Sequence, residues 1–133
     1  LSSNVKANKS EYFLKGKKLF EKNDFEKSKI FFERDIVFNP KNEKSYLYLA
    51  KIFNKDKKEE EEEMNLNNVL LLNPKNDEAI YLLALLKIKK SDYKEAQKLI
   101  DNLSMVCDSF CSKKAEIQKK LDKLIPENAK NNN

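Results

Sequence analysis

The stretch Asn39-Pro40-Lys41-Asn42 occurs a second time as Asn73-Pro74-Lys75-Asn76. An asparagine followed by proline is a turn signal, because proline has a fixed φ and its predecessor avoids helical geometry. Each copy therefore predicts a corner between two structural elements. The interval from position 39 to position 73 raises the question of whether the two corners are equivalent positions of a repeat.

The segments before the two corners match in kind and in place. Moving back by the same interval pairs Tyr46 with Tyr12, Ala50 with Gly16, Phe53 with Leu19, Leu66 with Phe32 and Leu70 with Ile36. Helical spacing of i, i+3, i+4 and i+7 places four residues of the second segment on one face: Tyr46, Leu49, Ala50 and Phe53. A third copy follows one interval later, with Ile80, Leu83 and Ala84, then Ser91-Asp92-Tyr93, Ala96 and Ile100.

This pattern resembles the tetratricopeptide repeat family, whose unit of about 34 residues folds as two antiparallel helices. The interval from position 39 to position 73 equals the length of that unit. The resemblance implies an all-α fold, a right-handed α-solenoid of antiparallel helix pairs with about seven helices. The domain would cover residues 9–126, and residues 1–8 and 127–133 are expected to be flexible tails. Its parts would be repeats at about 9–42, 43–76 and 77–110, and a capping helix at about 111–125.

Within these repeats, helical periodicity and the turn signals predict the bounds of each helix. The expected helices are 9–22, 25–38, 43–55, 58–72, 77–90, 93–106 and 111–125. The second repeat carries Glu59 and Glu62 where the family has an aromatic and a small residue. We therefore expect its two helices to pack less tightly than the others.

The resemblance also implies a concave groove lined by the first helix of each repeat, in which a protein-protein interaction scaffold would hold a segment of a partner protein. The candidate groove residues are Phe13, Lys17, Phe20, Leu47, Lys51, Asn54, Tyr81, Leu85 and Ile88. About half of them are expected to pack between neighbouring repeats instead, and Phe13, Lys17, Lys51 and Tyr81 are the favoured groove residues. Aromatic anchors among lysines would suit an amphipathic or acidic-apolar segment.

One subfamily of these repeats holds the C-terminal carboxylate of chaperones with lysine, asparagine and a further lysine or arginine at set groove positions. This sequence has Phe13 and Lys17 where that pattern has lysine and asparagine. It has Tyr81 and Leu85 where the pattern has two cations. We therefore do not expect it to bind chaperone tails.

Composition narrows the remaining function classes. The chain has no histidine and one glycine, so neither the usual general base nor a glycine-rich phosphate loop is present. We expect no enzyme, no cofactor, no metal site and no small-molecule substrate. The net charge is +5, but Arg34 is the only arginine among 27 basic residues, which makes nucleic-acid binding a weak third alternative. The second alternative is self-association into an oligomer through exposed apolar surface around Phe31 and Phe38 or on the second repeat.

Two features leave the cellular setting open. Cys107 and Cys111 lie four residues apart beside a predicted turn, where they would either form a disulfide or fill space as reduced thiols. The chain begins at Leu1 rather than methionine, which is typical of a piece of a longer protein. No apolar run is long enough to span a bilayer, so membrane contact is expected only through parts outside this chain. The sequence does not distinguish a cytoplasmic from a periplasmic or cell-envelope location.

Overall fold

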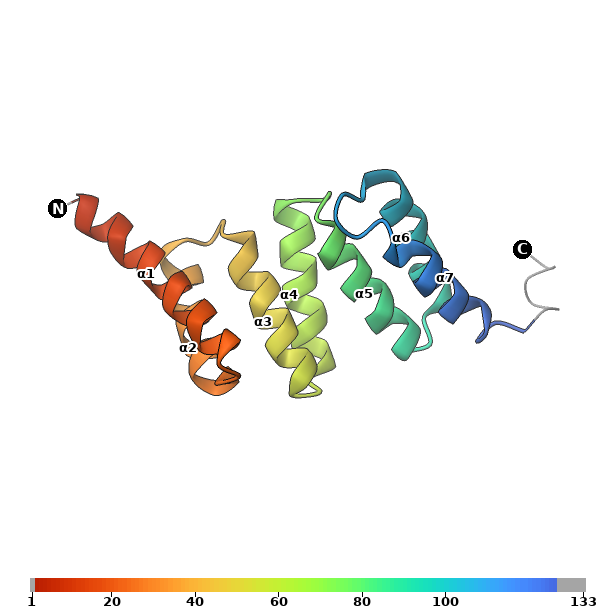
Figure 1. Cartoon of the computed structure of the whole chain (residues 1–133), viewed down its shortest axis with the longest axis horizontal. Coiled ribbons are helices and arrows are strands. Elements are labelled where there is room, and N and C mark those ends of the chain that lie inside the picture. Colours follow the sequence, from red (N-terminus) through yellow and green to blue (C-terminus); the bar gives the residue numbers. More distant parts are fainter. Residues whose placement is uncertain (1, 127–133) are drawn as a thin grey trace. The chain divides into compact units, whose positions relative to one another are not determined.

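The computed structural model describes residues 2–126, with their side chains from residue 11 onward, and every regular element in this range is an α-helix. Figure 1 shows the helices in chain order. They are α1 (Ser2–Glu21), α2 (Phe25–Phe38), α3 (Glu43–Lys55), α4 (Glu59–Leu72), α5 (Asp77–Lys89), α6 (Tyr93–Val106) and α7 (Lys113–Asp122). The predicted all-α fold with seven helices is confirmed over these residues.

The helix bounds differ from the expected ones mainly at the two ends of the chain. Helix α1 begins at Ser2, although the sequence predicts a tail over residues 1–8. No proline or glycine interrupts residues 2–9, so nothing in the sequence stops the helix from extending. The expected tail over residues 127–133 lies outside the described residues.

The chain divides into two compact units, Leu1–Leu72 and Asn73–Asn133. In the first unit, α1 packs on α2, α2 on α3 and α3 on α4. In the second unit, α5 packs on α6, and α7 packs on both of them. The division falls at the second Asn-Pro corner, and a single continuous domain over residues 9–126 stays a prediction.

The turns inside the three helix pairs repeat with the period of the sequence. Asn23, Lys57 and Ser91 are equivalent positions of the three repeats and have positive φ values of 64°, 58° and 61°. The residue after each of them donates its backbone N–H to a carbonyl five residues earlier: Asp24 to Leu19, Lys58 to Phe53 and Asp92 to Lys87, at 2.8–2.9 Å. The left-handed residue reverses the chain and satisfies carbonyls at the end of the first helix.

The first pair of helices is in closest contact at Gly16. A Cβ atom on Gly16 would lie 2.9 Å from Cε1 of Phe32, and the Gly16 carbonyl accepts a hydrogen bond from Ser28 Oγ at 2.7 Å. Phe32 is fully buried and stacks on Tyr48 of α3, with ring centroids 4.8 Å apart. Glycine is needed here because the Phe32 ring occupies the space between the two helices in which a Cβ atom would lie.

The second pair closes around a buried carboxyl, contrary to the looser packing expected from its glutamates. Glu62 is only 4% exposed. Its two carboxyl oxygens accept hydrogen bonds from Asn54 Nδ2 at 3.0 and 3.1 Å. A buried polar group is tolerated when it has hydrogen-bond partners, and Asn54 provides that compensation across α3 and α4.

The first Asn-Pro corner is held by a buried polar network. Asp35 of α2 is 1% exposed, and its Oδ2 accepts hydrogen bonds from Asn42 Nδ2 at 2.8 Å and from Ser45 Oγ at 2.5 Å. Asn42 also accepts the backbone N–H of Lys44 at 3.2 Å, so it caps α3 at the same time. The network joins the end of α2 to the start of α3.

One face of α1 differs from the equivalent faces of the later first helices. Glu11, Lys15 and Lys18 are exposed and lie at i, i+4 and i+7 on that face. The equivalent residues of the next two repeats are buried, with exposures of 0–5%: Ser45, Leu49 and Ile52 in α3, and Ala79, Leu83 and Leu86 in α5. Glu11 and Lys15 form an ion pair at 3.0 Å. This face of α1 is therefore charged where the later helices are mostly apolar.

No helix in the described part of the chain is both long enough and apolar enough to cross a membrane.

Candidate functional site

An aromatic surface joins α1 and α3 in the first unit. The Tyr48 ring of α3 lies between two rings of α1, with centroids 6.0 Å from Phe13 and 4.9 Å from Phe20. All three rings are half-buried: part of each packs on the core around Phe32, and part remains open to solvent. Because Tyr48 bridges two successive first helices, the rings form one continuous surface.

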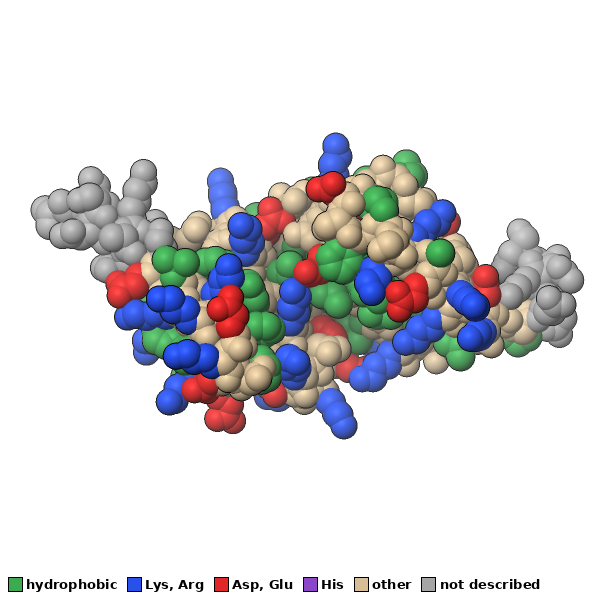
Figure 2. Space-filling model, in the orientation of Figure 1, with side chains coloured by type: hydrophobic (Ala, Val, Ile, Leu, Met, Phe, Trp, Pro, Cys, Tyr) green, Lys and Arg blue, Asp and Glu red, His purple; other side chains and the backbone are tan. Residues whose placement is uncertain are grey.

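Lysines lie among these rings. Lys17 is exposed between Phe13 and Phe20, at the helical spacings i+4 and i−3 that place all three on one face of α1. Lys51 is half-buried, and its amine lies 5.4 Å from the centroid of Tyr48, within cation–π range. We call Phe13, Lys17, Phe20, Tyr48 and Lys51 the aromatic–lysine face. Figure 2 shows hydrophobic side chains interspersed with lysines where α1 and α3 face the viewer.

The rest of the expected groove residues of this unit are placed less favourably for a ligand. Leu47 is half-buried. Asn54 is exposed, but its amide donates to the Glu62 carboxyl and so takes part in closing α3 on α4. The structure thus brings Phe13, Lys17, Phe20 and Lys51 together, and gives Asn54 a packing role.

In the second unit, the three candidates on α5 also differ among themselves. Tyr81 and Leu85 are half-buried, whereas Ile88 is 4% exposed and belongs to the core. Ile88 does not fit the predicted groove, because it lacks exposed surface to offer a partner. Tyr81 instead packs beside Phe110 from the loop between α6 and α7, with ring centroids 5.6 Å apart.

The loop that carries Phe110 is fastened by the Asp77 carboxyl at the start of α5. Asp77 is 8% exposed, and its Oδ2 accepts the backbone N–H groups of Asp108 at 2.7 Å and Phe110 at 2.9 Å. Desolvation alone would raise the pKa of Asp77, but hydrogen bonds from the backbone, led by those of Asp108 and Phe110, outweigh it and leave the pKa lowered. The carboxylate form therefore binds the loop.

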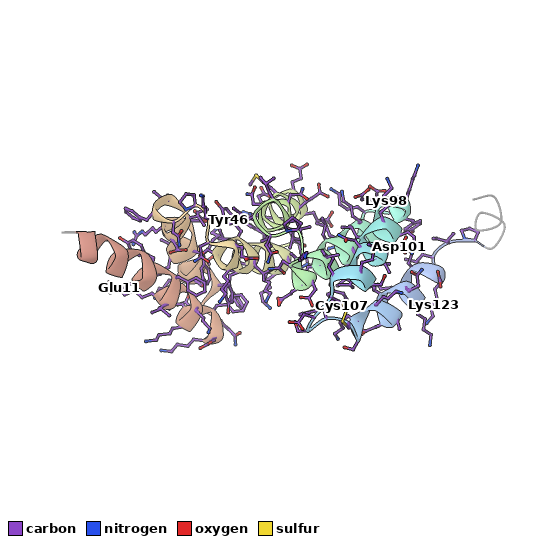
Figure 3. The ribbon with its side chains drawn as sticks, turned by 90° about the horizontal axis from the view of Figure 1, so that it is seen from above. Glu11, Tyr46, Lys98, Asp101, Cys107 and Lys123 are labelled. Carbon is purple, nitrogen blue, oxygen red and sulfur yellow. A yellow bond between two sulfur atoms is a disulfide. The ribbon has the colours of Figure 1, made fainter. Side chains whose placement is uncertain are left out.

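The same loop is closed covalently. Cys107, the C-cap residue of α6, and Cys111 form a disulfide in the structure (Figure 3). Cys107 is half-buried and Cys111 is exposed. The disulfide and the Asp77 carboxyl thus fix the same short segment from two sides.

Sequence reasoning missed three residues of these surfaces: Tyr48, Asp77 and Phe110. Tyr48 lies next to the expected groove stripe, and its equivalent in α1, Leu14, is 53% exposed, so the repeat pattern did not mark the position. The Asn-Pro corner just before Asp77 marked a helix start, where an acidic residue is common. Its contact with a loop 31 residues away leaves no local signal.

Across the described residues, no cluster of three or more acidic, cysteine or histidine side chains is placed to hold a metal ion. No protein-family model and no curated protein sequence matches the chain.

Solved structures with the same arrangement of helices do exist. The tetratricopeptide repeat (TPR) domain of Arabidopsis OM64 is similar with a TM-score of 0.81 at 20% identity, over 92% of this chain and 99% of that one. The TPR2B domain of yeast Sti1, in a complex with pHsp70, has a TM-score of 0.80 at 19% identity, over 90% and 99% of the two chains. The first TPR of Spaghetti (RPAP3), bound to an HSP90 peptide, has a TM-score of 0.74 at 16% identity, over 87% and 94%.

These similarities confirm the predicted fold of repeated helix pairs. At such identities the likeness concerns the fold alone. The side chains of this chain therefore have to be considered on their own.

Proposed function

We propose that this chain, which has the tetratricopeptide repeat fold, is a non-catalytic scaffold that binds a segment of a partner protein on its first helices. The observation that carries the proposal is the aromatic–lysine face, where half-open rings lie next to cationic side chains. Two of the similar solved structures, Sti1 and Spaghetti, are in complexes with pHsp70 and with an HSP90 peptide. Those complexes support a polypeptide as the kind of ligand.

The chemistry of the face favours an amphipathic segment with acidic residues. Aromatic rings that keep part of their surface open contribute apolar contact area at a small cost in side-chain entropy. Lysines beside the rings attract carboxylates and orient the segment. The expected partner is therefore a helix or extended segment that alternates apolar with aspartate or glutamate residues.

A chaperone C-terminus is not the partner that we propose. Phe13 and Lys17 occupy the positions on α1 where the chaperone-binding pattern has lysine and asparagine, and Phe13 contacts Phe32 and Tyr48 with its ring. Tyr81 and Leu85 stand on α5 where that pattern has cations. A terminal carboxylate would thus lack the charged and amide groups that the pattern supplies.

Fluorescence anisotropy with a labelled peptide tests the proposal. The probe is a short amphipathic peptide of leucine, phenylalanine and glutamate, compared with the same peptide carrying glutamine in place of glutamate. The double variant Lys17→Glu/Lys51→Glu is expected to weaken binding of the acidic peptide by about 10-fold or more, because each reversal replaces attraction with repulsion.

The matched control is Lys41→Glu/Lys44→Glu, which makes the same change of charge at the corner between α2 and α3. It is expected to change the affinity by less than about 3-fold, through the long-range field alone. Equal losses for both double variants would show that only net charge matters. No binding of the acidic peptide to the unchanged chain, or equal binding of the glutamine peptide, would count against the proposed partner.

Self-association is the second candidate, and exposed apolar residues of the second helices favour it. Val37, Leu71 and Met105 occupy the same position of the three repeats and are 75%, 82% and 82% exposed. Apolar residues exposed at one repeated position are candidates for contacts between copies. Sedimentation of the chain and of Val37→Ser/Leu71→Ser tests this: association that persists unchanged in the variant excludes these residues.

A further inference from the structure

The pair of Tyr81 and Phe110 is a second aromatic surface, and the loop between α6 and α7 builds half of it. Both rings are half-buried, and their planes are inclined by 42° with centroids 5.6 Å apart. Neither ring is therefore hidden by the other. Lys113 of α7 follows in the chain: its backbone N–H donates to the Phe110 carbonyl at 3.1 Å, and its amine forms an ion pair with Glu116 at 3.4 Å. The second unit thus has two half-buried aromatic rings side by side.

The position of the Phe110 ring depends on two contacts that hold its loop: the Cys107–Cys111 disulfide and the hydrogen bond to the Asp77 carboxyl. Cys107 is fixed at the end of α6, where its N–H donates to the Leu103 carbonyl at 2.9 Å. The disulfide ties Cys111, the residue next to Phe110, to this fixed point. On the other side, the Asp77 carboxyl accepts the Phe110 N–H. Removal of the disulfide would leave the ring held by the hydrogen bonds of its backbone and by its contact with Tyr81.

We infer that the Cys107–Cys111 disulfide positions Phe110 beside Tyr81 as an aromatic contact of the second unit for an acidic-apolar segment, so that the redox state of these cysteines regulates binding to this unit. This inference rests on the proposed function, because it concerns the affinity for an acidic-apolar segment of the same kind. The oxidised chain is the tight-binding form. Reduction lets the Phe110 ring leave Tyr81, and the partner then loses a pre-organised contact.

The chemical step is a thiol–disulfide exchange with a dithiol reductant. A thiolate of the dithiol attacks Sγ of the exposed Cys111, the Sγ–Sγ bond breaks, and Cys107 leaves as a thiolate. The second thiol of the reductant then attacks the mixed disulfide and releases Cys111. The dithiol becomes a disulfide, two electrons pass to the cysteine pair, and the two thiolates take up the two protons that the dithiol loses.

A tryptophan in place of Phe110 reports the position of the ring without any partner. The chain contains no tryptophan, so the emission of Phe110→Trp comes from this site alone. Treatment with dithiothreitol is expected to shift its emission to longer wavelength and to reduce energy transfer from tyrosine, as the indole leaves Tyr81. The matched control adds Cys107→Ser/Cys111→Ser; it should show the emission of the reduced form and no response to dithiothreitol. Unchanged emission on reduction of the disulfide would overturn the inference.

The acidic peptide described above then measures the effect on binding. Reduction, Cys107→Ser/Cys111→Ser and Phe110→Ala are each expected to weaken binding by about 3- to 10-fold, which is the usual range for one aromatic contact. Reduction should have no further effect on Phe110→Ala. Asn102→Ala, at an exposed position of α6 outside this loop, is the control and should bind normally.

The two experiments separate failure of the inference from failure of the proposed function. If the tryptophan responds to reduction but the unchanged chain binds no acidic peptide, the loop is redox-sensitive and the proposed function is wrong. If the peptide binds equally to the oxidised and reduced chain, the proposed function stands and the regulatory role of the disulfide is excluded. Tighter binding after reduction would also contradict the inference, because the loop would then cover Tyr81 rather than extend its surface.

Discussion

At the scale of single residues, the contact between Gly16 and Phe32 sets how closely α1 approaches α2. The repeats pair the two positions differently: Gly16 with Phe32, Ala50 with Leu66 and Ala84 with Ile100. The repeat with the largest residue on its second helix has the smallest one on its first. The fixed volume between two helix backbones explains this relation, because a methyl group added on one side requires a smaller side chain on the other.

Gly16→Ala is expected to destabilise the chain although alanine is the better helix former. The new Cβ would lie 2.9 Å from a fully buried Phe32 ring that stacks on Tyr48, so the ring has little room to move. Overpacking of about 1–3 kcal/mol exceeds the gain in helix propensity of about 0.5–1 kcal/mol. Urea unfolding measures the difference.

The double variant Gly16→Ala/Phe32→Leu is the companion test, since it copies the pair found in the second repeat. It should recover part of the stability lost in Gly16→Ala, although Phe32→Leu by itself removes packing with Tyr48. A Gly16→Ala variant that is as stable as the unchanged chain would show that the ring yields more easily than the structure implies.

The residue scale is also where prediction from sequence was weakest. Gly16, Phe32 and the repeat period could be read directly, because they recur in kind at fixed spacing. Tyr48 could not, because its role depends on a neighbouring repeat. No repeat precedes α1 among the described residues, and the equivalent Leu14 is 53% exposed. A side chain's exposure in a repeat array depends on the adjacent unit as well as on its own helix.

At the scale of elements, the first corner uses a polar network where the second has apolar residues at the same positions. Asp35 and Ser45 correspond to Val69 and Ala79, all of them at most 1% exposed. The Asn-Pro sequence is shared, so the two corners reverse the chain in the same way. What differs is the chemistry that fills the space behind the turn.

Asp35→Ala is expected to cost about 1–3 kcal/mol, because Asn42 and Ser45 would lose the acceptor of their buried hydrogen bonds. The double variant Asp35→Val/Ser45→Ala, which copies the second corner, should be more stable than Asp35→Ala. Thermal unfolding followed by circular dichroism gives both values. If the double variant were the less stable one, the corner would need its polar network for more than filling space.

Helix boundaries were predicted well for a physical reason. Turn residues at positions 23–24, 39–42, 57–58, 73–76 and 91–92 interrupt otherwise helical patterns, and the observed bounds of α2 and α3 agree with the predicted ones. The start of α1 was wrong, since residues 2–8 carry no breaker and yet show no apolar periodicity that would predict a helix. The tight packing around Glu62 was also missed, because its partner Asn54 is on another helix.

The Asp77 contact predicts a dependence of stability on acid. The pKa of Asp77 is lowered from its ordinary value of 3.8 in the folded chain, so the carboxylate contributes stability above the unfolded pKa. That contribution is lost as pH falls through the folded pKa, which lies below 3.8. Two other acidic residues, Glu78 and Asp108, contribute backbone N–H groups to the Asp77 carboxyl.

Hydrogen exchange of the Asp108 and Phe110 amides, measured between pH 5 and pH 2, checks this dependence. Protection relative to the intrinsic rate should fall in the acid range for the unchanged chain. Asp77→Asn, whose side chain keeps an oxygen acceptor but carries no charge, should have weaker protection that is nearly independent of pH. Equal pH dependence in both proteins would mean that another group controls the loop.

At the scale of the whole molecule, the charged face of α1 sets this helix apart from the first helices of the later repeats. In α3, which packs on α2 of the preceding repeat, the same face is mostly apolar and buried. Repeat arrays remain soluble because their end faces are polar. Glu11, Lys15 and Lys18 give α1 the character of such an end face, and Leu14 is the one large apolar residue among them.

Replacing the three charged residues with those of the second repeat, as Glu11→Ser/Lys15→Leu/Lys18→Ile, is expected to make the chain associate. The change would expose an apolar face that normally requires a packed neighbour. Light scattering at several concentrations should show a higher mean mass than for the unchanged chain. A control with glutamine at all three positions removes the charges without adding apolar surface, and should have the mass of the unchanged chain.

The ion pair between Glu11 and Lys15 contributes little to the stability of the fold, but it affects how copies of the chain could associate. The first and the last helix of a helical hairpin array present different surfaces. Identical copies that joined the first helix of one to the last helix of the next would therefore grow into open filaments. Charges on the first helix mean that every such junction would bury Lys18 and the Glu11–Lys15 ion pair, at a cost in desolvation. They act as a barrier to polymerisation that is built into the second half of α1.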